Sequence, residues 1–319
     1  FYGALYPSPQ QSWEFNLSRS NKVNEDYEVR YIHKVLLANK LEVNIFPYYF
    51  TDGSARFFGF QSASNKENET NYGDQEYGFT FTAGYKIGKN YQVVIGERFR
   101  KVNILQGAIA DIPFIGDRFS DQDVPGINGF TTHAQKLAIV YSTLNSPTMP
   151  TFGGYARLAI ENSSKIFGSS ADYQRYEAEM KGFIPLDNGR YISAFRLAFA
   201  QIGGSGVPFL EQSILGGEST LRGYGRNRFI DKSFFLLNLE ERIRLFRWEI
   251  FDVTADWELA PFVDVGSVMK SIDSINTRSF EFNPGIGFRA IVRPNIIGRV
   301  DVGFGEDGPA VFVGLGYPF

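Results

Sequence analysis

The feature that most constrains the fold is a strict two-residue alternation of apolar and polar side chains. Between residues 77 and 87 every odd position is apolar, and every even position is glycine, threonine or lysine. The same alternation returns in residues 237–245, 299–304 and 311–319. A period of two over about ten residues indicates a β-strand with one apolar face and one polar face. The chain is therefore predicted to be all-β.

Composition then separates a membrane barrel from a soluble sandwich. Phe and Tyr are abundant, at 31 and 17 of 319 residues, and these residues favour strands and membrane interfaces. No apolar run approaches the ~20 residues that a transmembrane helix needs. A soluble sandwich also alternates, but its strands average about five or six residues. The longer runs, with charges midway along the polar face, favour a transmembrane antiparallel β-barrel with a wet lumen.

The pattern predicts about sixteen strands in a single barrel domain that covers residues 1–319. The strands are predicted to start near residues 1, 10, 25, 38, 54, 76, 91, 131, 151, 170, 190, 233, 256, 278, 295 and 309. The chain starts at Phe1, without a methionine or a signal peptide. We therefore expect an upstream segment in the native protein, with a periplasmic domain as one form of it.

The connections between these strands are of two kinds. Tight turns are predicted at 51–53, 88–90, 186–189 and 293–295, after even-numbered strands. Long polar connections are predicted at 65–75, 104–130 and 202–232, after odd-numbered strands. Outer-membrane barrels have short periplasmic turns and long external loops. This parity predicts a protein of the cell outer membrane with both termini on the periplasmic side.

The most specific motif lies in the third of these long connections. Residues 215–225 read Leu-Gly-Gly-Glu-Ser-Thr-Leu-Arg-Gly-Tyr-Gly, with Arg222, Gly223 and Tyr224 at the centre. This segment resembles the Arg-Gly-Phe/Tyr motif of the BamA/TamA outer-membrane protein-assembly and secretion superfamily. The resemblance implies that this sixth extracellular loop folds back into the barrel. Residues 56–60 similarly resemble the family's fifth strand and its exit.

The resemblance also implies that the arginine meets acidic residues on the next two strands. Glu240 stands on the polar side of residues 238–243, and Asp264 lies in residues 262–266, which resemble the family's following strand. A buried guanidinium is tolerated where its donors meet carboxylates. Arg222, Glu240 and Asp264 are therefore predicted to lock the loop to the lumen wall. The same contacts are expected if the pair is structural only and has no role in transport.

The end of the chain carries a second match. Gly314, Leu315, Tyr317 and Phe319 resemble the C-terminal signal of outer-membrane barrels, which alternates towards a terminal Phe. Tyr317 and Phe319 are predicted to lie in the aromatic girdle at the membrane interface. Glu241 does not fit this alternation, because the register places its charged side chain on the lipid-facing side. It is predicted either to lie at the periplasmic interface or to follow a bulge that shifts the register.

The sequence predicts no catalytic residue, no cofactor and no metal site. Cysteine is absent, and the two histidines, His33 and His133, are far apart in the chain. Asp117, Asp121 and Asp123 lack the calcium-loop pattern, so an external acidic loop is the preferred interpretation. The net charge is -3 and the basic residues form no block, which disfavours nucleic acid as a partner.

The leading hypothesis is a protein insertion or translocation barrel that opens sideways where its first and last strands meet. That seam is predicted to be weak, because Gly3, Pro7, Gly314, Gly316 and Pro318 weaken the ladder on both sides. The predicted partners are outer-membrane lipids and unfolded outer-membrane or secreted proteins, with periplasmic domains or lipoproteins as further candidates. The alternative is a non-translocating barrel that anchors a partner or fused domain, or a small-solute pore.

Overall fold

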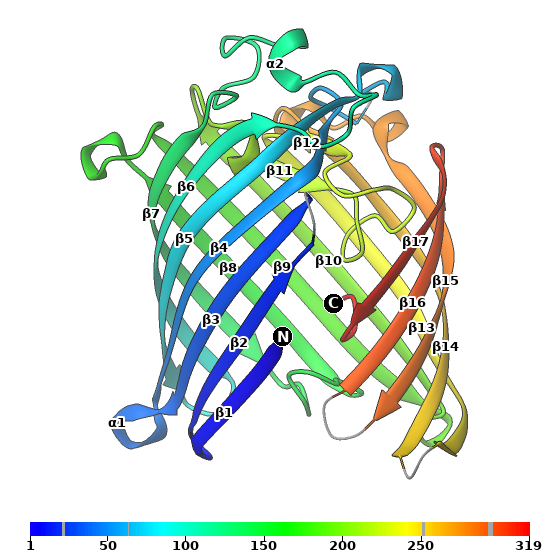
Figure 1. Cartoon of the computed structure of the whole chain (residues 1–319). Coiled ribbons are helices and arrows are strands. Elements are labelled where there is room, and N and C mark those ends of the chain that lie inside the picture. The colour runs from blue at the N-terminus through cyan, green and yellow to red at the C-terminus, as the bar shows by residue number, and fades with distance from the viewer. Residues whose placement is uncertain (21–22, 63, 251–252, 293–295) are drawn as a thin grey trace.

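The computed structural model describes residues 1–20, 23–62, 64–250, 253–292 and 296–319. Fifteen antiparallel strands form one sheet that curls into a barrel (Figure 1). The strands are β1 (Tyr2–Ser8), β2 (Gln11–Arg19), β3 (Asn24–Val35), β4 (Leu41–Phe57), β5 (Thr70–Ile87), β6 (Tyr91–Gln106), β7 (Phe130–Ser142), β8 (Gly153–Ser163), β9 (Tyr173–Leu186), β10 (Tyr191–Gly204), β13 (Ser233–Ile250), β14 (Val253–Met269), β15 (Glu281–Val292), β16 (Ile296–Gly305) and β17 (Gly308–Leu315). Two short strands, β11 (Ser213–Leu215) and β12 (Phe229–Asp231), pair with each other outside this sheet.

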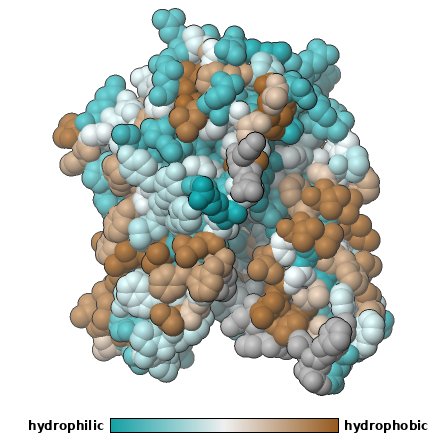
Figure 2. Space-filling model, in the orientation of Figure 1, coloured by the Kyte–Doolittle hydropathy of each residue, from teal (hydrophilic) through white to brown (hydrophobic). Residues whose placement is uncertain are grey.

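The alternation in the sequence becomes the two faces of this wall. Large apolar side chains such as Phe79, Leu158 and Val311 are exposed on the outside. Arginine and carboxylate side chains, among them Arg242 and Asp264, are buried on the inside. Figure 2 shows hydrophobic residues over the wall and hydrophilic residues gathered at one rim. A polar lumen behind an apolar outer band is the arrangement that a lipid environment requires.

One predicted turn is wrong. β4 runs unbroken through residues 51–53, where a tight turn was predicted before a new strand at 54, and residues 56 and 57 complete this fourth strand. The register with β5 shifts between Asp52 and Ala55, which marks a bulge. The Asp52 carboxylate accepts hydrogen bonds from the backbone N–H and the hydroxyl of Ser54. An Asp-Gly pair that commonly makes a turn therefore makes a bulge here, because the partner strand continues alongside it.

Because residues predicted as two strands belong to the single strand β4, the number of strands and the parity of the connections both change. The described sheet has fifteen strands rather than sixteen, and the tight turns after β5 and β9 follow odd-numbered strands. The tight connections share one rim with α1 (Leu36–Asn39), and the long connections 58–69, 107–129 and 205–232 share the other with α2 (Ile115–Arg118) (Figure 1). The turn predicted at 293–295 lies outside the described residues. No helix among the described residues is long and apolar enough to span a membrane.

The two edge strands of the sheet are β1 and β17. Within the described residues β1 pairs with β2, β17 pairs with β16, and no ladder joins the two edges. The backbone of Phe1 exchanges hydrogen bonds with that of Leu17, near the end of β2 that is farther from the short-turn rim. Both edge strands run towards the short-turn rim.

The C-terminal residues do not lie where the alternation predicts. Val313 and Leu315 are exposed on the outer face as expected. The chain then turns at Gly316, whose φ is +81°, and carries Tyr317 and Phe319 into the lumen. The prediction that these two aromatics lie in the outer girdle is therefore wrong. A positive φ is readily adopted by glycine, so Gly316 allows the chain to leave the strand.

Glu241 faces outward, as its position in the alternation predicts. It lies opposite Ser193, whose hydroxyl donates a 2.6 Å hydrogen bond to its carboxylate. Ser193 is the third residue of β10 after the tight turn at 187–190, so the carboxylate lies towards the short-turn rim. The register shift in β13 comes later, between Arg244 and Phe246. This place towards the short-turn rim fits the predicted interface position, and the register shift between Arg244 and Phe246 does not account for Glu241.

Candidate functional site: a loop bound inside the barrel

The connection between β10 and β13 folds into the barrel instead of extending from it. We call residues 205–232 the inner loop. It contains the β11–β12 hairpin, and residues 216–228 form the tip beyond that hairpin. Gly216 and Gly217 both have φ near +105° and turn the chain into the tip, where the Gly217 N–H donates to the carbonyl of Tyr224. The two glycines of the motif thus shape the turn that directs the tip at the wall.

Arg222 is fully buried at this tip, at 0% exposure. Its Nε and Nη2 donate to the two carboxylate oxygens of Asp264 on β14, each at a distance of 2.9 Å. Its backbone N–H donates to the same carboxylate at 3.0 Å. Its guanidinium carbon also lies 3.4 Å from the ring centre of Phe262. This forked contact fixes both the side chain and the main chain of the tip.

The remaining Nη1 of Arg222 links the loop to β13 and β16. It donates to Glu240 at a distance of 2.8 Å and lies 3.8 Å from a carboxylate oxygen of Asp301. Glu240 also accepts from Arg242 at 3.0 Å and from Arg289 at 2.8 Å. The structure therefore brings together Arg222, Glu240 and Asp264, and adds Asp301, which sequence reasoning did not identify.

The charges in this cluster balance closely, and that balance makes its burial tolerable. Arg289 and Arg299 both contact Asp301, so the cluster alternates cations and anions across five elements: the inner loop, β13, β14, β15 and β16. Burial alone lowers the pKa of Arg222, but the hydrogen bonds that it donates to Asp264 and the nearby charge of Glu240 raise that pKa above its usual value. A buried ion pair is doubtful as net stabilisation but effective in fixing one register. We therefore interpret the cluster as a positioning device for the inner loop.

Gly223 and Tyr224 extend the contact to β15 and β16. A Cβ on Gly303 would lie 2.2 Å from the carbonyl oxygen of Arg222, so only glycine allows the tip to lie flat against β16. The Tyr224 hydroxyl bonds to Glu281, and its ring packs edge-on against Phe229 at 4.8 Å. The full motif is thus used: Arg222 binds carboxylates, Gly223 permits close approach, and Tyr224 closes the hydrophobic side of the tip.

We expect the substitution Gly303→Ala to displace the tip from the wall. The new methyl group collides with backbone rather than with a flexible side chain, and overpacking of this kind costs about 1–3 kcal/mol. Limited trypsin digestion of the detergent-solubilised chain measures this displacement as faster cleavage within the inner loop. Gly298→Ala on the same strand meets nothing within 4 Å and serves as the matched control. Equal cleavage of the two variants would contradict the close packing of tip and wall.

A second anchor of opposite charge holds the start of the inner loop. Glu211 is 1% exposed, and its carboxylate receives two hydrogen bonds from Arg98, at 2.8 and 3.1 Å. Further donors come from four more lumen residues: Arg100, Thr132, Tyr173 and Arg175. Burial alone raises the pKa of Glu211, but Arg98 and Arg100 hold it well below its usual range. Sequence reasoning missed this residue, because a lone Glu in a loop has no motif.

The inner loop also packs against apolar residues at the long-loop rim. Phe209 and Ile230 of the loop are buried against Phe57, Tyr72 and neighbouring apolar residues. The connection 107–129 packs over them, and the Phe209 N–H donates to the carbonyl of Pro125 at 2.9 Å. Hydrophobic packing and two ion-pair anchors thus act together to hold the loop in place.

The other residues singled out in the sequence lie apart from this cluster. Gly314 faces the lumen near Glu218 and Arg299, while Leu315 faces outward. His133 pairs with Glu97 at 2.5 Å, and no group of acidic, histidine or cysteine side chains that could hold a metal ion occurs among the described residues.

Comparisons with known proteins agree with this architecture. The model of the Omp85 superfamily domain matches residues 10–295. Among solved structures, BamA from Haemophilus ducreyi lacking POTRA domains 1–3 is similar at a TM-score of 0.63 and 15% identity, over 95% of this chain and 63% of that one. CdiB from Acinetobacter baumannii is similar at 0.58 and 12%, over 96% of this chain and 53% of that one. The chain thus spans less than two thirds of either.

At these identities the two structures show the fold alone, whereas the family match covers most of the chain. The membership predicted from residues 215–225 is confirmed. The chain belongs to the Omp85 superfamily of outer-membrane β-barrels.

Proposed function

We propose that this barrel inserts or translocates proteins, and that it does so by opening sideways between β1 and β17. The observation that carries the proposal is the pair of unjoined edges: the described part of the sheet has no ladder between them. An edge strand presents free N–H and C=O groups, which pair readily with an incoming strand. The short-turn rim would face the periplasm, as in barrels with long external loops. In this orientation Phe1 begins β1 away from the periplasmic rim, which does not fit the predicted periplasmic N-terminus, whereas a periplasmic C-terminus stays a prediction.

Both edges are short, which keeps the energy of opening low. β1 has seven residues and β17 has eight, whereas β4 and β5 have 17 and 18. Pro7 in β1 and Pro309 in β17 each remove a donor from the ladder. Few hydrogen bonds would therefore be lost when the seam opens. The clients would be unfolded outer-membrane or secreted proteins, and we expect no enzymatic activity because no covalent bond changes.

In this proposal the inner loop acts as a plug that keeps the lumen sealed to solutes. Arg222 binds the loop to the wall at its tip, and Glu211 binds it at its start. The path that small solutes would take through the lumen is then blocked at the long-loop rim. The same fixed loop favours a second candidate, a closed barrel that anchors a bound or fused partner. Both functions need a sealed lumen, but only the first needs an edge that opens.

Client folding in liposomes tests this proposal. A small unfolded outer-membrane barrel is diluted from urea into liposomes that contain this chain, and its folded fraction is followed by heat-modifiable gel mobility. Liposomes with an unrelated closed barrel are the control for disturbance of the bilayer. The proposal predicts faster client folding only with this chain. Equal rates in the two preparations would favour the anchor.

A further inference from the structure

A segment of chain joins the two sides of the seam at the long-loop rim. The connection 58–69, described except for residue 63, leaves β4 on one side of the seam and packs against β14 on the other (Figure 1). We call it the strap. The hydroxyl of its buried Ser62 accepts a hydrogen bond from the Val268 N–H at 2.9 Å and lies 3.1 Å from the hydroxyl of Ser267. These contacts link the two halves of the sheet without a strand ladder.

Arg228 ties the strap to the hairpin that β16 and β17 form. It lies at the end of the inner-loop tip and is 6% exposed. Its Nε donates to Asp307, in the turn between β16 and β17, at 2.6 Å. Its Nη1 and Nη2 donate to the hydroxyl and the carbonyl of Ser64 at 2.8 and 3.0 Å, and its guanidinium carbon lies 4.6 Å from the ring centre of Phe58. One planar fork therefore holds the strap and the β17 hairpin at a fixed separation.

A cavity of about 510 Å³ lies at this long-loop end of the seam. Its lining includes residues 52–56 of β4 on one side, residues 307–310 of the hairpin on the other, and residues 223–228 of the tip. The tip thus lies between the two sides of the seam, and Arg228 supplies a hydrogen bond to each of them.

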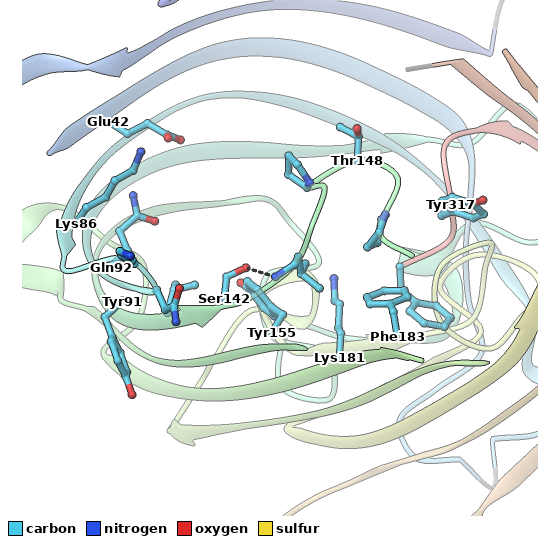
Figure 3. A pocket seen from close by; sticks show the side chains of 17 residues that line it. Glu42, Lys86, Tyr91, Gln92, Ser142, Thr148, Tyr155, Lys181, Phe183 and Tyr317 are labelled. Carbon is cyan, nitrogen blue, oxygen red and sulfur yellow. Dashed lines mark hydrogen bonds between the residues drawn. The ribbon is translucent and has the colours of Figure 1, made fainter. Parts of the chain in front are cut away.

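The short-turn end of the seam has no comparable link. Among the described residues no hydrogen bond or ion pair joins β1, β2 or β3 to β16 or β17. A cavity of about 660 Å³ opens into the lumen at the short-turn rim, and no residue of the strap or the inner loop lines it (Figure 3). The contacts across the seam are therefore gathered at one end, as they are in a hinge.

We propose that the strap and Arg228 keep the long-loop end of the seam closed, so that β1 and β17 part from the short-turn end alone. Arg228 is then a positioning residue, which acts through the strap and touches no client. The inference rests on the proposed function, because it assigns the direction in which the seam opens. A client strand would enter at the short-turn end, where both edges have free backbone groups.

Distances across the two ends of the seam test the role of Arg228 without a client. The chain has no cysteine, so pairs of spin labels can be attached at chosen positions. Ser20→Cys/Glu306→Cys reports on the long-loop end, and Gln10→Cys/Leu315→Cys reports on the short-turn end, by pulsed electron paramagnetic resonance in liposomes. We expect a narrow distance distribution for the first pair and a broad one for the second. Arg228→Ala should lengthen and broaden the first distribution and leave the second unchanged.

Two further variants make the distances specific. Arg226→Ala removes an exposed arginine of the same tip and should change neither distribution. Asp307→Asn keeps the shape of the side chain but removes the charge that Arg228 binds, and it serves if Arg228→Ala does not fold. Unchanged distances at the long-loop end in both Arg228→Ala and Asp307→Asn would overturn the inference.

A lock on the strap tests the direction of opening. Ser62→Cys/Ser267→Cys places two sulfur atoms where hydroxyl oxygens lie 3.1 Å apart, within reach of a disulfide. A short bis-maleimide joins the same pair if oxidation does not. The inference predicts that the locked barrel accelerates client folding in liposomes as much as the unlocked one, because the long-loop end stays closed while the seam works. Client folding that the lock abolishes would show that this end must open, and would overturn the inference.

The inference and the proposed function fail separately. If the wild-type barrel does not accelerate client folding, the proposed function is contradicted, and the distances still decide whether Arg228 closes the long-loop end. Accelerated folding by a wild-type barrel whose long-loop end shows a broad distance distribution would contradict the inference alone.

Discussion

Replacing Arg222 with alanine should release the tip of the inner loop and raise the single-channel conductance of the barrel in planar bilayers. The substitution leaves Glu240, Asp264 and Asp301 buried with one cation fewer. Removing one partner of a buried ion pair costs about 3–5 kcal/mol, which is enough to favour an undocked tip. We expect small currents from the wild type and larger, fluctuating currents from the variant.

Two substitutions make this result specific. Arg222→Lys keeps the charge but loses the fork that binds both oxygens of Asp264, so it should give an intermediate conductance. Arg226→Ala removes an arginine of the same tip whose side chain is 68% exposed and pairs with Glu218 at the surface. It should conduct like the wild type. Large steady currents from the wild type, unchanged by Arg222→Ala, would show that the loop is not a plug.

Replacing Glu211 with glutamine should free the start of the inner loop, with an effect of similar size. Arg98, Arg100 and Arg175 would then face one another with less negative charge between them. Glutamine keeps the shape of the side chain, so the change isolates the charge. We expect faster trypsin cleavage within residues 205–232 and a higher conductance than the wild type.

The two anchors hold one loop, so their effects should not add. In the double variant Arg222→Ala/Glu211→Gln neither end is held by charge, and the conductance should exceed the sum of the two single increases. Such coupling is expected of residues that share one structural element. Strict additivity would mean that the two anchors act on different parts of the barrel.

Mild acid should not open the barrel through Glu211. Arginine neighbours lower the pKa of this carboxyl well below its ordinary 4.5, so the charge stabilises the docked loop above that value and is lost only as the pH falls through the lowered pKa. Conductance at about pH 5 should therefore match that at neutral pH. An increase between these two values would contradict the assigned charge state of the anchor.

The sequence predicts the features that depend on local pattern. Within the strands the alternation assigns the outer and inner faces correctly, down to the outward Glu241, because in a barrel wall every strand is half lipid-facing and half lumen-facing. The inward fold of the loop and its contacts with Glu240 and Asp264 are implied by the resemblance of residues 215–225 to a family motif, and the structure has both contacts.

The features that the sequence misses depend on partners distant in the chain. Asp52-Gly53 is a common turn signal, and only the neighbouring β5 makes it a bulge. Tyr317 and Phe319 continue the alternation in the sequence. In the structure their rings lie inside the lumen, where Arg242 contacts Tyr317 and the cluster with Phe183 contacts Phe319. Glu211 becomes an anchor only because three arginines from two strands meet at one point.

The most direct test of the account is a reversible lock on the seam. The chain has no cysteine, so one cysteine in β1 and one in β17 can form only the intended disulfide within a chain. A panel of pairs that combines residues 3–5 with residues 311–313 finds those that oxidise. In liposomes the oxidised barrel should fail to accelerate client folding, and reduction should restore the wild-type rate. Full acceleration by the oxidised barrel would contradict lateral opening between β1 and β17.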